Sequence, residues 1–401
     1  MLRAILTLLS GSSLSTAITI AASPFLTRLY APEDFGLVAA VLSVSSVLSI
    51  IIPGRFPLAI PLADNEEDAK SLFYLATLMC LILSPLMAAA AVLMGQVVLA
   101  GTSAFVGFLY VLAATFLASQ GQVFGFWRNY RKRFAFAAKN GVLRSILATG
   151  SQFALSGVTA AGMLLGNLFG GLAAMAVSVR EIVVNDRAIL QGMPGRGQLL
   201  DVFKRYRDFP IFSMPQGLVA SVSKNSVPLI IAYFSGAAMA GQYWLVYRVL
   251  AAPIDILGGA YKQVILSHLG SQKGDDTENL RLIRRHSMVM GLVSLPPVAV
   301  ILYAGPDIFP LVFGDQWLMA GVFSGWMIMS FTLSLVAVPA VCLLQLQGRH
   351  RHILIYDIVS GALRLAGLTL GLMFLGEVEA IQIFALTTAS ALAVLLVWTL
   401  R

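Results

Sequence analysis

The sequence predicts an all-α polytopic membrane protein with 12 transmembrane helices, and three observations support this class. Twelve apolar stretches fill nearly all of the 401 residues, each about long enough to cross ~30 Å of hydrocarbon. Hydrophobic residues make up 58% of the chain and charged residues only 11%, which is more apolar surface than a soluble domain of this length could bury. Basic residues fall mostly into alternate gaps between the stretches.

The expected helices follow one another with short connections. They cover residues 5–27, 35–60, 71–94, 97–119, 141–158, 161–183, 210–232, 237–261, 286–305, 318–345, 352–375 and 378–399. The longest polar stretch, 184–209, separates six helices from six, and an even number in each half gives both halves the same orientation. This predicts two six-helix bundles, related as a parallel pseudo-repeat, around a central cavity. The expected domains are an N-terminal bundle over 1–190, a cytoplasmic linker over 191–209 and a C-terminal bundle over 210–401.

The placement of charge predicts the orientation. Most of the 27 Lys and Arg residues lie in the amino-terminal tip, the even-numbered gaps or the carboxyl end, whereas the odd-numbered gaps carry acids or almost no charge. We expect a multi-pass protein of the cytoplasmic (inner) membrane. By the positive-inside rule, both of its termini are expected on the cytoplasmic side. The first helix contains Ala21-Ala22-Ser23, which is typical of a signal-peptide cleavage site. Its apolar run is longer than a usual signal core, so we expect it to be retained as a membrane helix.

Charged residues inside the apolar stretches are the candidate functional residues. A charge at mid-membrane costs ~2.5–3.5 kcal/mol on insertion scales, so its presence suggests a role. Six such residues occur: Arg55, Lys224, Arg248, Asp255, Asp357 and Arg364. Four cations against two acids leave a positive surplus that an anionic ligand could neutralise. Arg28, at the outer end of the first helix, adds a further cation.

These cations suit a phosphate-bearing ligand, because arginine binds phosphate through its planar fork and lysine acts as a point charge. The predicted substrate-binding residues are Arg55, Lys224, Arg248, Arg364 and Arg28. For Arg55 and Arg28 the alternative is snorkelling to the membrane interface. Asp255 and Asp357 are candidates for ion coupling, since a desolvated carboxylate can titrate in the working range. The alternative is that they are structural counter-ions, with Arg248 facing Asp357, or Asp255 facing Arg364, across helices.

Metal, nucleotide and catalytic sites are not expected. His350 and His352 flank Arg351, a repulsive setting for a divalent cation, and no phosphate-binding G-x-x-x-x-G-K-[ST] loop occurs, so we predict no metal and no cofactor. The histidines lie in or beside cytoplasmic gaps and the outer loops are short, so the chain is not expected to be an enzyme. The basic and aromatic run over 128–134 predicts contact with anionic lipid head groups rather than with nucleic acid.

Five stretches together resemble a known family. LTRLYAPEDFGLVAA (Leu26–Ala40) closely resembles the first outer turn of the bacterial polysaccharide and O-antigen flippases, which belong to the multidrug, oligosaccharidyl-lipid and polysaccharide exporter superfamily. Four further stretches look similar to that family: RFPLAIPLADNEEDA (Arg55–Ala69), YRDFPIFSMPQGLVASVS (Tyr206–Ser223), AGQYWLVYRVLAAPIDILG (Ala240–Gly258) and VFGDQWLMAG (Val312–Gly321). The resemblance extends along the whole chain.

The resemblance implies a flippase that moves an undecaprenyl-diphosphate-linked oligosaccharide from the cytoplasmic to the periplasmic leaflet by alternating access. The partners that it implies are this glycolipid, membrane lipids and polysaccharide polymerase or assembly proteins. Arg55 occupies the family's arginine position, but Pro57 stands where a glutamate commonly follows, so Arg55 needs another partner. One alternative is a multidrug or cation antiporter of the same fold, which would favour an acid-rich cavity. Another is a membrane glycan polymerase or ligase, which would need a substantial outer loop.

Overall fold

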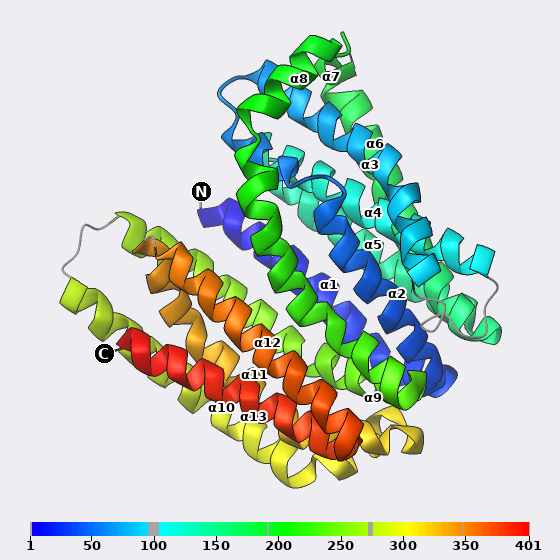
Figure 1. Cartoon of the computed structure of the whole chain (residues 1–401), viewed down its shortest axis with the longest axis vertical. Helices are drawn as coiled ribbons and strands as arrows, with labels where there is room; N and C mark the ends of the chain where they lie inside the picture. The colour runs from blue at the N-terminus through cyan, green and yellow to red at the C-terminus, as the bar shows by residue number, and fades with distance from the viewer. Residues whose placement is uncertain (1, 95–103, 191, 272–275, 348, 401) are drawn as a thin grey trace. The chain divides into compact units, whose positions relative to one another are not determined.

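The computed structural model describes residues 2–94, 104–190, 192–271, 276–347 and 349–400, and within these ranges every regular element is a helix (Figure 1). The predicted all-α membrane fold is therefore confirmed. The first half contains α1 (Leu2–Leu29), α2 (Pro32–Ile51), η1 (Phe56–Leu62), α3 (Glu66–Met94), α4 (Ala104–Tyr130), α5 (Phe134–Ala154), η2 (Ser156–Val158), α6 (Thr159–Asn185), α7 (Arg187–Leu190) and α8 (Arg196–Arg205). The second half contains η3 (Phe209–Ser213), α9 (Met214–Ser271), α10 (Asp276–Phe313), η4 (Asp315–Trp317), α11 (Leu318–Leu346), α12 (His350–Phe374) and α13 (Glu377–Leu400).

The long helices agree with the predicted twelve crossings. In the described ranges, nine helical segments are long and apolar enough to cross a membrane, and the one over Phe209–Gly259 includes both arms of a broken helix. This break is at Gly236, whose φ of 85° and ψ of 170° interrupt α9. The remaining two long helices, α1 and α5, have 28 and 21 residues, enough to cross by length alone.

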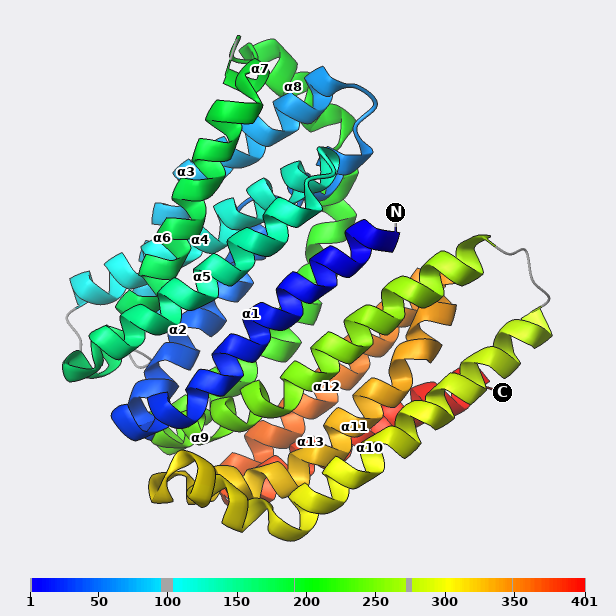
Figure 2. The same ribbon diagram turned by 180° about the vertical axis from the view of Figure 1, so that it is seen from behind.

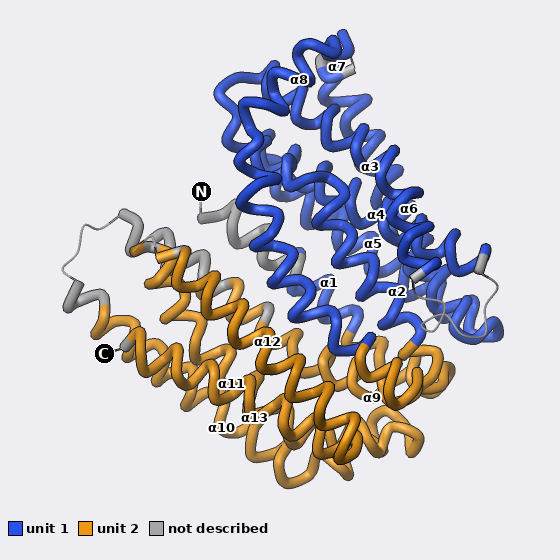
Figure 3. The backbone as a smooth tube through the Cα atoms, viewed as in Figure 1, with its two compact units in different colours: residues 1–19, 37–229 blue, residues 20–36, 230–401 orange. Residues whose placement is uncertain are grey.

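Two compact units make up the chain, and their boundaries do not coincide with the two sequence halves (Figure 3). Unit 1 comprises residues 1–19 and 37–229, and unit 2 comprises residues 20–36 and 230–401. The part of α1 up to Thr19 therefore belongs to unit 1, and the part from Ile20 onward belongs to unit 2. The proposed pseudo-repeat and the domain boundaries at 190 and 210 remain predictions.

Unit 1 is a bundle held together by antiparallel neighbours along the chain. Helix α5 packs against α6, α3 against α4, and α4 also against α6, as can be followed in Figure 2. Small residues permit close approach, because a Cβ on Gly166 or Gly170 of α6 would collide with the backbone of α5. At the end of the bundle, the amphipathic helix α8 lies against α3.

Unit 2 contains the last four long helices. Helix α10 packs along α11, and α13 packs against both α11 and α12 (Figure 2). Apolar residues fill the contacts, for example Ala337 and Ala340 of α11 against Leu396 of α13. Four prolines lie inside α10, yet it remains one continuous helix from Asp276 to Phe313.

Several predicted helix boundaries differ from the structure, and two of the differences concern candidate basic residues. The second span was expected to run to residue 60, but α2 ends at Ile51 because Pro53-Gly54 follows and Gly54 takes a φ of 58°. Arg55 therefore lies in a turn, with a φ of 60°, and not inside a helix. The fifth span was expected from residue 141, but α5 already begins at Phe134, so its first two turns carry charge.

Candidate functional site

Arg55 is the predicted site residue whose surroundings are clearest. Its left-handed backbone conformation follows the break after α2 and starts the 3-10 helix η1. The guanidinium lies on Gly217 of α9, where any Cβ would overlap it. Both residues belong to unit 1, and η1 also packs against η3, which immediately precedes α9. Two of the stretches that carry the family resemblance, 55–69 and 206–223, therefore meet here.

The Arg55 guanidinium has no acidic partner among the described residues. Its Nε is buried without a hydrogen-bond acceptor, and Pro57 supplies none. A buried guanidinium nitrogen without an acceptor is costly, so this position favours an anion that arrives from outside the protein. The side chain is only partly buried, which leaves room for such an anion to approach.

Lys224 lies farther along the same arm of α9. It is seven residues beyond Gly217, which places the two residues on one helix face about two turns, or ~10 Å, apart. Lys224 is exposed, and it interacts with a neighbouring group in the structure. Unit 1 therefore aligns two of the predicted cations, Arg55 and Lys224, along one side of this arm.

Arg248 and Arg364 belong to unit 2, each beside aromatic side chains. The Arg248 guanidinium lies over the Trp244 ring, 5.4 Å from its centroid, and both lie on the second arm of α9. Arg364 of α12 donates from Nε to the Ser360 carbonyl at 3.2 Å. Arg364 also interacts electrostatically with the buried Tyr243 of α9.

Of the two candidate coupling acids, Asp357 and Asp255, the structure describes the side chain of Asp357 only. Asp357 is half-buried on α12 and interacts electrostatically with Arg364, which lies seven residues along the same helix. The interaction favours the interpretation of Asp357 as a counter-ion of Arg364. The two residues lie on one helix, whereas the sequence suggested pairs across helices. Asp255 belongs to α9, but its side chain lies outside the described part of the structure.

Arg28 stays at the end of its helix. It is exposed, and its Nη1 donates to the Pro24 carbonyl at 3.2 Å while its Nη2 donates to the Leu311 carbonyl at 3.4 Å. Both acceptors are backbone carbonyls of unit 2. In this position Arg28 ties the end of α1 to α10.

The remaining resembling stretches meet in unit 2. The Thr27 carbonyl accepts hydrogen bonds from Trp317 Nε1 at 3.0 Å and from Gln316 Nε2 at 2.6 Å. Gln242 Nε2 donates to the Gln316 carbonyl at 2.6 Å, and Phe35 stacks edge-on against Trp317 with centroids 4.9 Å apart. The stretches 26–40, 240–258 and 312–321 thus form one junction. Thr27, Phe35, Gln242, Gln316 and Trp317 of the signature therefore specify packing at this junction.

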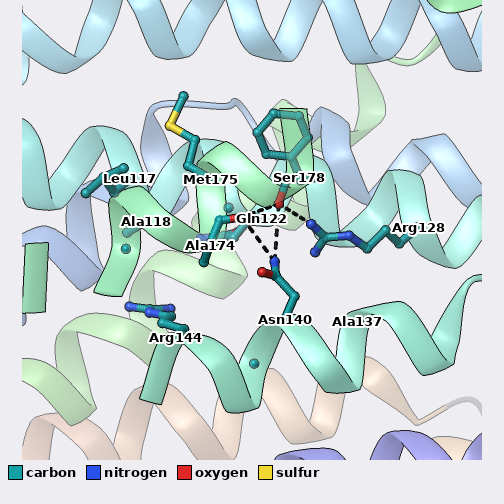
Figure 4. A pocket seen from close by; sticks show the side chains of 14 residues that line it. Leu117, Ala118, Gln122, Arg128, Ala137, Asn140, Arg144, Ala174, Met175 and Ser178 are labelled. Atoms are coloured by element: carbon teal, nitrogen blue, oxygen red, sulfur yellow. Dashed lines mark hydrogen bonds between the residues drawn. The ribbon is translucent and has the colours of Figure 1, made fainter. Parts of the chain in front are cut away.

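The sequence reasoning missed one embedded cation, Arg144. It lies in α5 and, with Arg128, Asn140 and Ser178, lines a pocket of about 300 Å³ between α4, α5 and α6 in unit 1 (Figure 4). The signal was present: a basic residue ten positions into a helix of 21 residues. It was overlooked because the predicted start at residue 141 assigned Arg144 to the helix end.

Fold and cationic side chains define the class first: a polytopic, all-helical membrane transporter. The sequence model of the family described as "Polysaccharide biosynthesis protein" matches residues 25–321, so the chain belongs to that family. The resemblance to polysaccharide flippases is thereby confirmed. A curated relative, the lipopolysaccharide biosynthesis protein WzxC of Escherichia coli (strain K12), is 29% identical over 101 residues. This match covers 25% of the chain and only 20% of the relative's length.

Solved structures support the fold. One, described as the inward-facing conformation of a multidrug resistance MATE family transporter of the MOP superfamily, has a TM-score of 0.63, 15% sequence identity, and coverage of 98% of this chain and 97% of its own. A MATE in complex with MaD3S has a TM-score of 0.60 at 15% identity, with coverage of 99% of this chain and 94% of its own. At this level of identity the likeness concerns the fold alone.

Proposed function

We propose that this protein translocates an undecaprenyl-diphosphate-linked oligosaccharide from the cytoplasmic to the periplasmic leaflet of a bacterial inner membrane by alternating access. The observation that carries the proposal is the Arg55 guanidinium, which has no acidic partner in the described residues and rests on Gly217. A diphosphate would supply the missing negative charge through bidentate hydrogen bonds. Membership of the polysaccharide biosynthesis protein family supports a glycan-bearing substrate.

The other cations are proposed as further substrate-binding residues during translocation. Lys224 follows Arg55 along its arm of α9, and Arg248 and Arg364 belong to unit 2. In this proposal Arg28 contributes at the outer end and both termini are cytoplasmic, as the charge alternation predicts. Asp357 would balance Arg364, and an ion-coupling role for Asp255 and Asp357 remains part of the proposal. The assembly partners remain those implied by the family.

The test is transport by the purified protein. Vesicles that contain the full chain and a fluorescent polyprenyl-diphosphate-linked oligosaccharide are assayed for access of the label to a membrane-impermeant quencher, under imposed pH or sodium gradients. Arg55→Ala should slow the movement roughly 10- to 100-fold, since a charged hydrogen-bond pair contributes ~1.5–3 kcal/mol. The control is Arg196→Ala, which removes an exposed arginine of α8. Movement that the wild-type protein does not accelerate over empty vesicles would contradict the proposal.

Organic-cation export is the second candidate, because the solved structures of similar fold include multidrug transporters. The predicted site residues of this chain contain five cations and two acids, a composition that repels a cationic drug. The same vesicles, loaded with ethidium, separate the two functions. We expect no gradient-driven ethidium movement, and rapid movement combined with an immobile glycolipid would favour the antiporter.

A further inference from the structure

The pocket of unit 1 that contains Arg144 lies apart from the predicted substrate-binding residues. Its lining comes from α4, α5 and α6 and includes none of Arg55, Lys224 or the unit 2 cations. The volume of about 300 Å³ is at the lower end of the range for small-ligand sites. The pocket can therefore hold a small polar group.

The charge of the pocket is positive. Its lining includes two arginines and no acid. Arg128 is already neutralised, because its Nε pairs with Glu181 Oε2 at 3.0 Å and its Nη2 donates to Ser178 Oγ. Arg144 has no ion pair or hydrogen bond in the described part of the chain, and its side chain lines the pocket opposite Arg128 (Figure 4). One uncompensated guanidinium therefore faces the space.

Asn140 supplies a second polar group of the pocket that a ligand could bind. It is 7% exposed, and its Nδ2 donates to the Ala174 carbonyl at 3.2 Å and to Ser178 Oγ at 3.2 Å. Because a carbonyl can only accept, this contact fixes which end of the amide is nitrogen. The opposite atom, Oδ1, is buried and has no donor. A buried acceptor of this kind favours a ligand that carries an O–H or N–H group.

We propose that this pocket binds a phosphate ester that also carries a hydroxyl or ammonium donor. Arg144 holds the phosphate oxygens, and Asn140 Oδ1 accepts from the donor. Two sources share this chemistry: a phospholipid head group, and a free phosphate compound from solution. The pocket extends along α4 from Arg128, two residues before the end of that helix, to Leu117, ~16 Å away. One end of the pocket therefore lies beside the basic 128–134 run.

The proposal is tested with full-length protein by native mass spectrometry and by thermal unfolding, separately from transport. The probes are phosphatidylglycerol and phosphatidylethanolamine, each added to delipidated protein, and inorganic phosphate alone. The wild-type protein should retain a phosphate-bearing probe and unfold at a higher temperature with it. Arg144→Gln should weaken retention at least 10-fold, and Arg144→Lys should retain part of it, because lysine keeps the charge without the fork.

A second variant fills the space without removing any polar group. Gly121 of α4 lines the pocket, and a Cβ added there meets nothing within 4 Å. Gly121→Leu should abolish retention even though Arg144 and Asn140 remain, and this variant decides the matter if Arg144→Gln does not fold. The matched controls are Gly125→Leu, one turn farther along α4 with equally open space, and Lys139→Gln, an exposed cation of α5. Neither residue lines the pocket.

The probes identify the source. Retention of phosphatidylglycerol or phosphatidylethanolamine alone indicates a lipid head group, whereas stabilisation by inorganic phosphate alone indicates a soluble ligand. Either result, with loss in Arg144→Gln and Gly121→Leu but not in the controls, supports the site. The proposal is overturned if wild-type protein retains no phosphate probe, or if Gly121→Leu binds as the wild-type protein does. The glycolipid transport assay is unaffected by that outcome.

Discussion

Gly217 determines where the Arg55 side chain can lie. Because the guanidinium covers the glycine Cα, any larger residue at 217 must displace it. The colliding atoms are the far end of a flexible side chain and not backbone, so the protein can relax by moving Arg55 alone. In the proposed function, position 217 therefore acts through the placement of Arg55, and we expect it to have little influence on folding.

We expect Gly217→Ala to reduce glycan export as strongly as Arg55→Ala, while the amount of protein in the membrane stays within twofold of wild type. The measurement is surface glycan in a strain whose own transporter has been deleted. The double variant should be no worse than either single variant, because both remove one interaction. Gly150→Ala serves as control, since a Cβ at that position meets nothing within 4 Å. Additive losses in the double variant would show that Gly217 acts independently of Arg55.

The buried ion pairs at the end of the unit 1 bundle are expected to contribute to stability. Arg128 and Glu181 have side chains only 9% and 3% exposed, and Glu181 also pairs with Arg133 at 3.4 Å. Removal of the carboxylate leaves a buried guanidinium without its counter-ion. Such a loss costs ~3–5 kcal/mol in folded proteins.

Glu181→Ala should accordingly lower the free energy of unfolding by about 3–5 kcal/mol. The measurement is unfolding of the protein in mixed micelles by increasing amounts of sodium dodecyl sulfate. The control is Glu66→Ala, which removes one of the two acidic partners of Arg131, at a side chain that is 57% exposed, while Asp186 remains. That exposed pair should contribute less than ~1 kcal/mol because solvent screens it. Equal losses in the two variants would contradict the distinction.

At the level of elements, α9 depends on the glycine at its break. A φ of 85° with a ψ of 170° is reached almost only by glycine, so Gly236 lets two helical arms follow each other in one element. Space does not limit this position, because a Cβ would meet nothing within 4 Å. Only the backbone conformation requires glycine.

Gly236→Ala should therefore destabilise the protein by ~1–3 kcal/mol through backbone strain alone. The midpoint of thermal unfolding in detergent, followed by size-exclusion chromatography, measures the change. Gly259→Ala is the matched control on the same element, since its Cβ also meets no atom within 4 Å and its backbone is helical. If both alanines leave the midpoint unchanged, the break does not need the glycine conformation.

At the level of the whole molecule, the direction of insertion is a prediction that thiol labelling can check. The two native cysteines, Cys80 and Cys342, are buried, so their background reaction with an impermeant maleimide should be low. A cysteine at the exposed Glu33 should react in intact cells with the outer membrane permeabilised. A cysteine at the exposed Lys132 should react only after the inner membrane is opened. The reverse pattern would place both termini outside.

Much of the fold could be predicted because each crossing needs a long apolar run, and such runs stand out in the sequence. Arg55 and Arg144 were harder to place. Pro53-Gly54 is typical of a helix end and marks the break after Ile51. Because apolar residues continue beyond it, the hydrophobic pattern predicted one long helix. Because the first two turns of α5 carry charge, the predicted helix began at residue 141, and Arg144 was placed near its end instead of well inside it.

The sequence by itself determined the class: hydrophobic run length, the alternation of charge and five resembling stretches predict a helical membrane transporter of a polysaccharide family. Tertiary structure alone decided which distant residues meet. It brought Arg55 onto Gly217 and formed a pocket between α4, α5 and α6 that Arg144 and Asn140 line. The physical reason is that helical periodicity specifies which residues share a face, whereas the neighbour of that face depends on how whole helices pack.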